Sequence, residues 1–397
     1  MKGCDDIKIG LFTDTYYPQI NGVATSVLTL KNNLEAMGHE VYVFTTTEPK
    51  ALKGEKNVFR MSSVKFSTDN RLAIFYYPRI VRKAKNLKLD VIHTHTEFTI
   101  GRLGHHIAKE SSLPLVHTMH TIYEDFTHFL LKIKSLSKMS KPAARLMTKQ
   151  FCNFANIVIA PTNKTKRLLI DYGVEKSISV IPTGIELDMF KNTDNENLER
   201  NILRSQNGIG KEDKVLLYIG RISKEKNIDE LIKLLAGYLP KRPDVKFVLI
   251  GNGQHLDELK QLSIDLNISK QVIFTGQKPW KDIGYYYRIG DIFVNASQSE
   301  TQGLTYIEAL ASGLPIIAKK DECLEDVLIE GENGFVFTQK EQLYKALDTL
   351  LDNAELRKKM SEFAVQSIEK FTAKQYAESV LNIYTEAISR FHINKNN

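Results

Sequence analysis

Between two short apolar runs, the chain reads Ser299-Glu300-Thr301-Gln302-Gly303-Leu304-Thr305-Tyr306-Ile307-Glu308-Ala309-Leu310. The flanking runs, Ile292–Asn295 and Pro315–Ala318, are rich in β-branched residues, as is typical of strands covered on both faces. The segment Leu304–Ala311 between them has a helical period. This part of the chain therefore predicts a strand, a helix and a second strand that runs parallel to the first.

The same alternation recurs along the chain and predicts an α/β protein with two Rossmann-like, doubly wound parallel sheets. Helical segments such as Ser26–Met37 and Ile228–Tyr238 separate the strands. In the first half we expect strands at Ile7–Phe12, Glu40–Thr45, Asp90–His93, Leu115–Thr118, Ile157–Ala160 and Ser179–Ile181. In the second half we expect strands at Lys214–Ile219, Lys246–Ile250, Gln271–Thr275, Ile292–Asn295, Pro315–Ala318 and Gly334–Phe337.

Two domains are expected, because single cores stop growing at about 250–300 residues and this chain has 397. The seam falls at the turn-forming stretch Pro182–Glu186, and the polar run Lys191–Asn201 is expected to loop over the surface. We predict an N-terminal domain over 1–185, a C-terminal domain over 186–372, and a final helix over 373–397 that packs back toward the N-terminal domain. Because open α/β sheets bind ligands beyond the carboxyl ends of their strands, two facing domains would bind theirs in the cleft between them.

The composition is that of a soluble globular protein, with 42% hydrophobic and 25% charged residues. The three cysteines are scattered, which favours a reducing compartment. No apolar run opens the chain and none reaches about 18 residues, so neither a signal peptide nor a membrane span is expected. Residues 1–185 carry 26 Lys and Arg against 15 Asp and Glu, whereas residues 186–397 carry 28 against 32. Only the first half is therefore expected to face an anionic surface, although many soluble proteins are mildly basic for no such reason.

The stretch quoted first also has the features of an anion-binding helix start. The first turn of a helix presents backbone N–H groups and the positive end of its dipole, which suits a phosphate. Gly303 has no Cβ and lets a ligand approach the backbone closely. Glu300 before the helix and Glu308 about one turn inside it can accept hydrogen bonds from hydroxyls, so the pattern describes a nucleotide-sugar site. The alternative is an amphipathic helix with solvated acids.

Two further loops carry groups suited to a diphosphate. Arg221 and Lys226 follow the strand that ends at Ile219, and together they can neutralise a diphosphate leaving group. Asn21 and Gly22 precede a helix, where the glycine allows backbone N–H groups to approach the same phosphate. The alternatives are a solvated charged loop and a glycine that serves only its turn. The chain has neither GxGxxG nor a Walker loop, which disfavours dinucleotide and ATP binding.

Most of the ten histidines lie in one short span of the first half. A metal site is the tempting interpretation, but no HExxH occurs, so we expect no metal. We expect instead that His93 with His95, and His117 with His120, end two adjacent strands and line the cleft, where a histidine can bind a sugar hydroxyl. The span contains His93, His95, His105, His106, His117, His120 and His128.

A basic segment without acids, Lys132–Lys149, mixes cations with apolar residues and favours an anionic membrane interface. Tyr123 and Phe126, just before it, are candidates to line the site of a lipid acceptor. The alternatives are an ordinary solvated helix and ordinary core. The cations of the segment are Lys132, Lys134, Lys138, Lys141, Arg145 and Lys149, and a second basic run holds Arg79, Arg82, Lys83, Lys85 and Lys88.

Taken together, these residues resemble the retaining glycosyltransferases of family 4, which have the two-domain GT-B fold. The resemblance covers nearly the whole chain, and its elements occur in the family's order. They are the E-x7-E pair Glu300 and Glu308, the Gly-Arg-x4-Lys loop with Arg221 and Lys226, the Asn21-Gly22 loop, and the turn Ile181–Ile185.

The resemblance implies roles for these residues. Glu300 and the backbone after it would hold the donor hexose, Glu308 the ribose, and the two cations the diphosphate. The family's histidine close to the hexose is similar to His120, so catalysis would rest on His120, Glu300, Arg221 and Lys226. No obligatory cofactor is expected, and Mg²⁺ would at most stimulate. The donor-binding residues would be Asn21, Gly22, Arg221, Lys226, Glu300, Gln302, Gly303, Leu304, Thr305 and Glu308.

Around the first acid the family usually has E-G/S-F-G, whereas this chain has Glu300-Thr301-Gln302-Gly303. With the stretch His117–Glu124, that departure resembles the bacterial 1,2-diacylglycerol 3-alpha-glucosyltransferases. The resemblance implies transfer of glucose from UDP-glucose to diacylglycerol with retention of the α configuration. It also implies a peripheral protein at the cytoplasmic face of the cell membrane. The acceptor and membrane residues would be Tyr123, Phe126, Lys134, Lys138, Lys141 and Arg145.

Other functions remain open from the sequence. The same fold can glycosylate a soluble or polysaccharide acceptor, or act as an epimerase on a UDP-sugar alone. A non-catalytic membrane-bound module is a further alternative, which the paired carboxylates and cations disfavour. No nucleic-acid partner is expected, because the basic residues lack an interleaved aromatic platform. Glucose or galactose as the donor sugar, one or two sugars added, and metal dependence are also left open.

Overall fold

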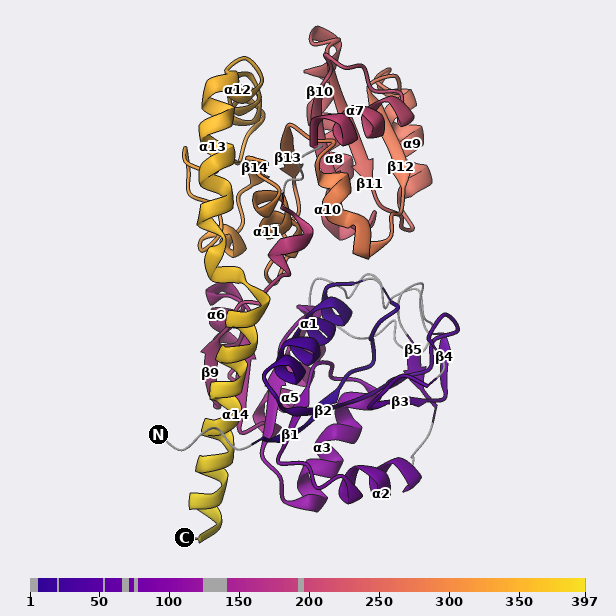
Figure 1. The fold of residues 1–397 in the computed structure, drawn as a ribbon. Helices are drawn as coiled ribbons and strands as arrows, with labels where there is room; N and C mark the ends of the chain where they lie inside the picture. Colours follow the sequence, from indigo (N-terminus) through magenta and orange to yellow (C-terminus); the bar gives the residue numbers. More distant parts are fainter. Residues whose placement is uncertain are drawn as a thin grey trace. The chain divides into compact units, whose positions relative to one another are not determined.

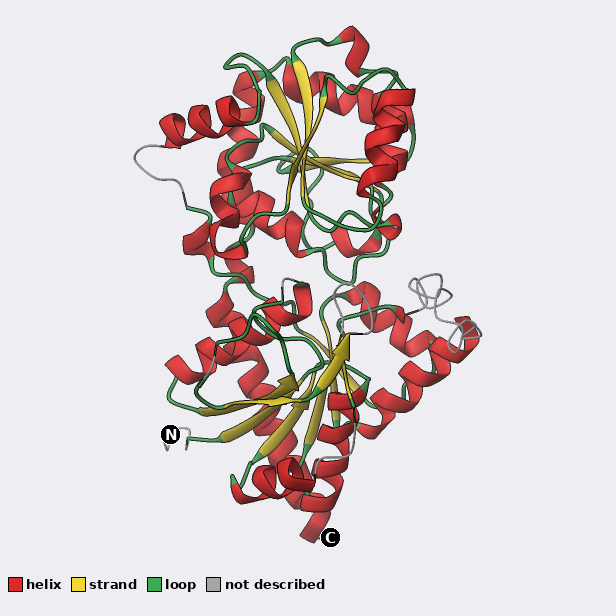
Figure 2. Ribbon diagram, turned by 90° about the vertical axis from the view of Figure 1, so that its right-hand side faces the viewer, coloured by secondary structure: helices red, strands yellow, loops and turns green. Residues whose placement is uncertain are grey.

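The computed structural model describes residues 6–19, 21–52, 54–65, 71–74, 78–123, 141–191 and 196–396. The chain forms two compact units (Figure 1). Met1–Gly184 together with Ala373–Asn397 is called the N-terminal unit, and Ile185–Thr372 the C-terminal unit. Each unit has its own parallel sheet with helices on both faces (Figure 2). The predicted α/β fold with two doubly wound sheets is therefore confirmed.

The described part of the N-terminal unit contains a seven-stranded sheet in the order β3-β2-β1-β6-β7-β8-β9, with every neighbouring pair parallel. A separate antiparallel pair joins β4 (Ser63–Lys65) and β5 (Arg71–Ala73). The strands of the large sheet are β1 (Lys8–Phe12), β2 (Glu40–Thr46), β3 (Val58–Met61), β6 (Val91–Thr94), β7 (Leu115–Thr118), β8 (Ile157–Ala160) and β9 (Ser177–Val180).

Apolar helix faces cover both sides of this sheet, which is why its central strands are apolar almost throughout. Ile9 and Leu11 of β1 belong to the core cluster that α1 and α14 cover. Phe12 belongs to the opposite cluster, which α2, α3, α5 and α6 cover. The helices of the unit are α1 (Gly22–Ala36), α2 (Pro78–Asn86), α3 (Thr99–Ser111), α5 (Lys141–Phe154), α6 (Asn163–Asp171) and α14 (Ala373–Asn396).

Helix α14 comes last in the chain and yet packs on the N-terminal unit. The Tyr376 hydroxyl lies 3.0 Å from Ser26 Oγ of α1, and the Tyr384 hydroxyl lies 2.7 Å from Nδ1 of His93 in β6. Both tyrosine side chains are buried. Since each buried hydroxyl has a hydrogen-bond partner, these contacts fix the position of the helix as well as burying its apolar face.

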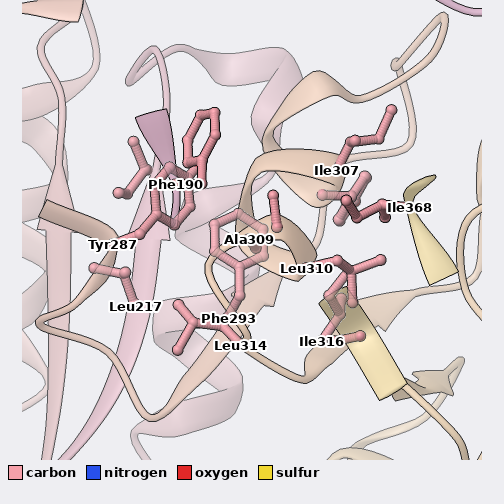
Figure 3. Close-up of a cluster of buried hydrophobic side chains, with 14 of the residues drawn as sticks. Phe190, Leu217, Tyr287, Phe293, Ile307, Ala309, Leu310, Leu314, Ile316 and Ile368 are labelled. Carbon is pink, nitrogen blue, oxygen red and sulfur yellow. The ribbon is translucent and has the colours of Figure 1, made fainter. Parts of the chain in front are cut away.

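The described part of the C-terminal unit contains a six-stranded parallel sheet in the order β12-β11-β10-β13-β14-β15. Tyr287, Phe293 and Leu310 belong to the cluster that fills one face (Figure 3). The strands are β10 (Lys214–Ile219), β11 (Val245–Ile250), β12 (Val272–Gly276), β13 (Ile292–Asn295), β14 (Ile316–Lys319) and β15 (Gly334–Phe337). The helices are α7 (Glu196–Gln206), α8 (Ile228–Leu235), α9 (Leu256–Asp265), α10 (Ile283–Tyr287), α11 (Leu304–Ala311), α12 (Lys340–Leu351) and α13 (Ala354–Ser367).

Short 3₁₀ turns supplement these helices. They are η2 (Leu187–Met189), η3 (Lys224–Lys226), η4 (Leu239–Lys241), η5 (Trp280–Asp282), η6 (Glu322–Leu324) and η7 (Glu369–Phe371).

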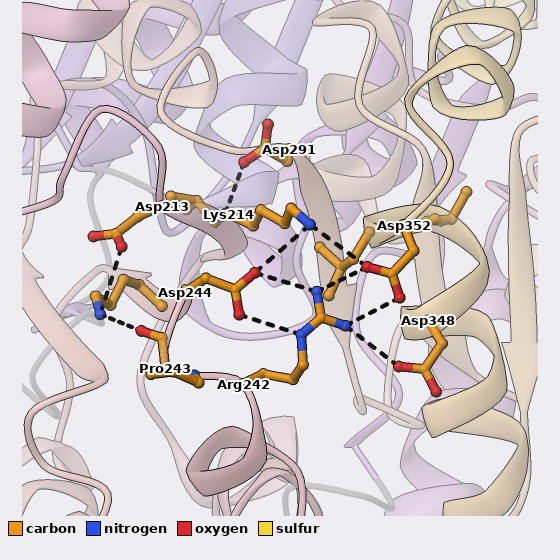
Figure 4. Close-up of polar contacts among 12 residues, drawn as sticks. Asp213, Lys214, Arg242, Pro243, Asp244, Asp291, Asp348 and Asp352 are labelled. Atoms are coloured by element: carbon orange, nitrogen blue, oxygen red, sulfur yellow. Dashed lines mark hydrogen bonds and ion pairs between the residues drawn. The ribbon is translucent and has the colours of Figure 1, made fainter.

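A polar network joins the amino ends of β10 and β11 to the end of α12 (Figure 4). The Arg242 guanidinium contacts Asp244 at 3.2 Å and Asp352 at 2.9 Å, and Lys214 Nζ lies 3.5 Å from Asp352. These hydrogen bonds raise the pKa of Arg242, so the guanidinium stays charged. Because the network lies at the amino ends of the strands, the carboxyl ends of the same sheet are left for binding chemistry.

The structure differs from the sequence-based expectations at α7 and at β3. The run Lys191–Asn201 was expected to be a loop, but α7 begins at Glu196. That helix is anchored by Arg204, whose buried guanidinium donates to the Ile289 carbonyl at 2.9 Å and to Asp291 at 2.7 Å. The edge strand β3 is an addition to the predicted strands; it has only four residues, and three of them are half-buried.

Candidate active site

The first charged loop of the C-terminal unit follows β10. The Arg221 Nη2 atom lies 3.0 Å from Glu225 Oε1, and Ser223 Oγ donates to the same oxygen at 2.7 Å. Tyr218 of β10 donates its hydroxyl to the Arg221 carbonyl at 3.0 Å, which fixes the backbone of the loop. The Arg221 side chain is about a third exposed at 36%, whereas Glu225 is buried at 5%. An arginine is thus held at the carboxyl end of a strand by a carboxylate that the sequence analysis did not single out.

The second loop follows β13 and pairs with the first. Lys226 Nζ lies 2.6 Å from Glu300 Oε1, and the two side chains are 17% and 13% exposed. Ser299 Oγ donates to the Glu225 carbonyl at 3.1 Å. The structure therefore brings together two residues that lie far apart in the chain. A half-buried, charge-assisted contact of this kind positions both groups well.

Helix α11 begins directly after this loop, at the glycine that the sequence indicated. Gly303 is the N-cap residue, with φ of 75°, and a Cβ there would lie 2.5 Å from the buried ring of Tyr306. Only glycine fits this combination of backbone conformation and space. Leu304 and Thr305 form the first turn, and Gln302 before it is buried. The arrangement retains the helix start that can bind an anion.

Glu308 lies one turn further along α11 and is only 8% exposed. Its Oε2 atom accepts a hydrogen bond of 2.7 Å from the hydroxyl of Tyr287 in α10. The pKa of Glu308 is raised to about 7, because the effect of burial exceeds the opposite effect of the Tyr287 hydrogen bond. Near neutral pH this carboxyl is therefore poised between its two protonation states.

The glycines after β11 explain how tightly these loops pack. A Cβ on Gly251 would lie 1.9 Å from the Gly220 carbonyl oxygen, and one on Gly253 would lie 2.0 Å from that of Ile222. Side chains at either position would push the Arg221 loop away from the strand end. This close backbone approach gives both glycines a structural purpose.

In the N-terminal unit, Asn21 and Gly22 form the start of α1. The Asn21 side chain accepts a hydrogen bond of 2.9 Å from the Ala24 backbone and donates one of 2.8 Å to Thr15 Oγ1. Asn21 is thus the N-cap of α1, and Gly22 is its first residue. These contacts give Asn21 a local structural role beside the donor-binding role that we predicted.

The four strand-end histidines are adjacent, but three of them, His93, His95 and His117, are buried and not available to line a binding surface. His93 and His117 are completely buried, and His93 Nε2 lies 2.7 Å from Thr118 Oγ1. His120 is half-buried, and its Nε2 atom lies 3.0 Å from His95 Nδ1. The expectation that all four line a ligand site is therefore corrected, because His93, His95 and His117 are buried in the unit.

A buried carboxylate that sequence reasoning missed lies in the same region. Glu97 is 1% exposed, accepts a hydrogen bond from the Tyr123 hydroxyl and has its other oxygen 3.3 Å from His117 Nε2. His117 Nδ1 lies 3.0 Å from both the carbonyl oxygen and the hydroxyl of Thr94. The only sequence signal was an acid two residues after His95, which is too common a pattern to identify a site.

The residues predicted to contact acceptor or membrane are in different surroundings. Tyr123 is buried, so its ring belongs to the core at this point. Lys141 and Arg145 are exposed on α5, and the Arg145 guanidinium lies 5.4 Å from the ring centre of Tyr172. Phe126, Lys134 and Lys138, together with the whole part of Lys132–Lys149 that precedes α5, lie outside the described residues.

The described residues contain neither a cluster of metal-binding side chains nor a helix that could span a membrane. No group of three or more His, Cys, Asp or Glu side chains in that part of the chain could hold a metal ion. In the same part, each helix is too short or too polar to cross a membrane.

Known families account for nearly the whole chain. Residues 20–189 match Glycosyltransferase Family 4, and residues 199–367 match Glycosyl transferases group 1. A relative from Streptococcus pneumoniae is 38% identical over 390 residues, which cover 96% of this chain and 86% of the relative. The chain therefore belongs to the family 4 glycosyltransferases.

Within that family, two similar relatives carry the same description. The Streptococcus pneumoniae relative is an alpha-monoglucosyldiacylglycerol synthase. So is a relative from Acholeplasma laidlawii, which is 34% identical over 390 residues, covering 97% of this chain and 98% of its own. The predicted likeness to bacterial diacylglycerol glucosyltransferases is thereby confirmed.

Solved structures support the fold. The Anabaena protein Alr3699/HepE, in complex with UDP and glucose, has a TM-score of 0.78 at 19% identity and covers 96% of this chain and 100% of its own. A glycosyltransferase from Rickettsia africae has a TM-score of 0.75 at 19% identity, with coverage of 97% and 99%. At these identities the likeness shows the fold alone, which is the two-domain GT-B fold.

Proposed function

We propose that this protein transfers glucose from UDP-glucose to the free hydroxyl of 1,2-diacylglycerol and retains the α configuration. The observation that carries the proposal is the near full-length identity to two alpha-monoglucosyldiacylglycerol synthases. At 38% and 34% identity, the conserved architecture extends over both units rather than over one shared module.

The loops of the C-terminal unit are suited to a UDP-sugar. Arg221 and Lys226 bring two cations to the carboxyl end of β10, and α11 adds its helix start, which together match a diphosphate. Glu308 can accept hydrogen bonds from ribose hydroxyls, and Glu300 from hydroxyls of the hexose. The Anabaena protein of the same fold has been solved with UDP-glucose, which supports a nucleotide-sugar as the donor.

In the transfer step, the bond between glucose C1 and the diphosphate oxygen breaks while the acceptor oxygen bonds to C1 on the same face. The acceptor proton passes to the departing diphosphate. Negative charge grows on the leaving group, and cations already held in place stabilise it without reorganisation. From the N-terminal unit we assign His120 to the same step as a hydrogen-bonding group. No cofactor is needed in this scheme, and Mg²⁺ would at most stimulate.

Two basic helices of the N-terminal unit support docking on an anionic membrane surface. Helix α2 buries Val81 and Ala84, and its other side exposes Arg79 and Arg82. Cations on a short amphipathic helix attract anionic headgroups by about 1 kcal/mol each near the surface. A surface hollow of about 410 Å³ on this helix is lined by Arg79, Arg82, Lys83, Asn86 and Leu87.

The second basic helix is α5. It exposes Lys141, Arg145 and the apolar Leu146, which is 55% exposed, while Phe151 and Cys152 lie in the core. Exposed cations beside an exposed leucine are typical of helices that lie at a membrane interface. We therefore assign the protein to the cytoplasmic face of the cell membrane as a peripheral enzyme.

Mass analysis of the products tests the proposal. UDP-glucose and UDP-galactose are supplied together with vesicles of diacylglycerol in anionic phospholipid, and a parallel reaction contains glycerol and soluble sugars instead of lipid. We expect one hexose on the lipid, derived from UDP-glucose, with the α configuration by NMR. Transfer only to the soluble acceptors, or consumption of the donor without an acceptor, would contradict the proposal and favour a different acceptor or an epimerase.

A further inference from the structure

Three histidine rings of the N-terminal unit lie in a row. The ring centres of His93 and His95 are 4.0 Å apart, and those of His95 and His120 are 5.3 Å apart. The far end of the row is held by Tyr384 of α14 and by Thr118 of β7, each 2.7 Å from a different nitrogen of His93. The fixed ring of His93 thus restrains the orientation of the His95 ring. His95 in turn contacts His120, which we assign to the transfer step.

The two nitrogens of His95 are in unequal surroundings. Its Nδ1 atom lies 3.0 Å from His120 Nε2, so one of these two nitrogens donates a proton to the other. Its Nε2 atom is buried, and the described residues offer it no hydrogen-bond partner. The His95 side chain as a whole is 1% exposed, so bulk water does not supply the missing partner.

Only two arrangements of neutral rings fit this geometry. If His120 donated to His95, the proton of His95 would be on Nε2, as a buried N–H group with no acceptor. If His95 donates to His120, the unpartnered atom is a bare lone pair. Orphaned buried N–H groups are rarer in proteins than under-satisfied acceptors. The second arrangement is therefore favoured.

We infer that His95 is a positioning residue that fixes the tautomer of His120: it donates from Nδ1 to His120 Nε2 and so keeps the proton of His120 on Nδ1. His120 then acts as a hydrogen-bond donor through its Nδ1–H, and its Nε2 lone pair is occupied. In this state His120 cannot take the acceptor proton through Nε2. The hydrogen bond made by one ring nitrogen commonly decides which nitrogen carries the proton.

The charge state of the rings agrees with this assignment. Burial holds the pKa of His95 well below its usual range, with smaller contributions from His93 and His120. Burial, together with the nearby His117, lowers the pKa of His120 to about 3. Both rings are therefore neutral near pH 7, which is the condition under which a tautomer is defined.

For the reaction, a donor at His120 Nδ1 would bind an oxygen of the substrate. That consequence rests on the proposed glucosyl transfer, whereas the tautomer itself belongs to the protein without substrate. A neutral N–H donor suits a sugar hydroxyl, because it adds no charge close to the group that is transferred. It also agrees with a step in which the diphosphate, rather than a side chain, receives the acceptor proton.

Nitrogen-15 NMR of the histidine-labelled full-length protein at neutral pH tests the inference directly, with His120→Asn to assign the signal. We expect the Nδ1–H tautomer of His120 in the wild-type protein. In His95→Leu we expect a shift toward the Nε2–H form and a fall in turnover of about 10–100-fold, by analogy with the loss of partners that orient metal-binding histidines. The side-chain amide N–H of His95→Asn can replace the Nδ1 donor, so this variant should recover most of the Nδ1–H tautomer of His120 and most of the turnover.

His392→Leu, an exposed histidine on α14, is the matched control and should change neither measurement. An Nε2–H tautomer or an imidazolium at His120 in the wild-type protein would overturn the inference, as would an unchanged His120 signal in a folded His95→Leu variant. If that variant does not fold, the wild-type spectrum and His95→Asn decide. Calorimetry with UDP-glucose separates the two proposals: lack of binding would contradict the proposed function and leave the tautomer assignment intact.

Discussion

The strand ends of the two units use opposite chemistry. In the C-terminal unit the functional groups are charges of opposite sign in contact, Lys226 with Glu300 and Arg221 with Glu225, and most are partly accessible. In the N-terminal unit they are uncharged imidazoles, with His95 and His120 bonded to each other. Held charges stabilise a group whose charge changes during reaction, whereas neutral donors suit hydroxyls. Under the proposed function, the difference fits Arg221 and Lys226 to the diphosphate and the neutral ring of His120 to a hydroxyl.

The largest effect on turnover is expected from Glu300→Ala, which removes one of the paired charges of the C-terminal unit. The change removes the carboxylate that positions Lys226 at 2.6 Å and that we assign to the hexose. Loss of one preorganised electrostatic contact lowers turnover by about 10²–10³-fold. Initial rates of UDP release with diacylglycerol vesicles measure the effect.

The matched control is Glu362→Ala, which removes an exposed glutamate from α13 of the same unit and should leave the rate unchanged. Near-normal turnover in a folded Glu300→Ala protein would remove this residue from the proposed site. It would also leave Lys226 without its assigned role.

A second, smaller effect concerns the stability of the C-terminal unit. The pKa of Glu308 is about 7 in the folded protein, against an ordinary value of 4.5. Between these values the unfolded chain loses its proton while the folded one keeps it, so stability falls as the pH rises from 4.5 to 7. Glu308→Gln has no such proton to lose. The free energy of unfolding of Glu308→Gln, minus that of wild type, should therefore increase by about 3 kcal/mol at most between pH 4.5 and pH 8. Urea unfolding at a series of pH values measures it.

His120 provides a comparison for this test, because its effect on stability changes with pH in the opposite direction. The lowered pKa of His120 means that the unfolded chain gains a proton below 6.5 while the folded protein does not. Stability from this residue is therefore present above pH 6.5 and is lost as the pH falls toward 3. If the difference in unfolding free energy between Glu308→Gln and wild type does not change with pH, the Glu308 carboxyl is not held protonated by burial. Glu362→Gln serves as the control.

The smallest effect is expected for membrane docking. The double change Arg79→Gln and Arg82→Gln on α2 should weaken binding to anionic vesicles about five-fold per residue, at about 1 kcal/mol each. Raising the salt concentration should weaken wild-type binding in the same way, because exposed charges are screened over about 8–10 Å at physiological ionic strength. Vesicle sedimentation measures both.

The control for the α2 cations is a pair of exposed cations on α13 of the C-terminal unit, Lys358 and Lys359. Changing both to Gln should have no effect on vesicle binding. Equal binding of the wild-type protein to neutral and anionic vesicles would show that α2 does not act through its charge.

The core strands of both sheets could be predicted because local pattern decides them. β10 and β13 begin and end as expected, since apolar runs in a two-sided sheet have sharp ends. The start of α7 and the strand β3 could not be predicted, because tertiary contacts decide them. Arg204 is buried by hydrogen bonds to Ile289 and Asp291, and β3 is stabilised by pairing with β2.

The candidate site divides in the same way. Gly303 and Glu308 follow from the sequence of one loop and one helix, so their spacing already places them. The partners that tune them come from other elements: Tyr287 reaches Glu308 from α10, and Tyr123 reaches Glu97 across the N-terminal unit. No local pattern marks such contacts, because the residues meet only when the sheets have formed.

The packing of α14 on the N-terminal unit has a consequence for biosynthesis. The chain enters the C-terminal unit after Gly184 and returns at Ala373, so the N-terminal unit is assembled from two segments that are separated in the sequence. While the ribosome is still translating the intervening residues, Ser26 and His93 lack their tyrosine partners and an apolar face of the sheet stays uncovered. The C-terminal unit, which is continuous in sequence, can be complete in the nascent chain before the N-terminal one.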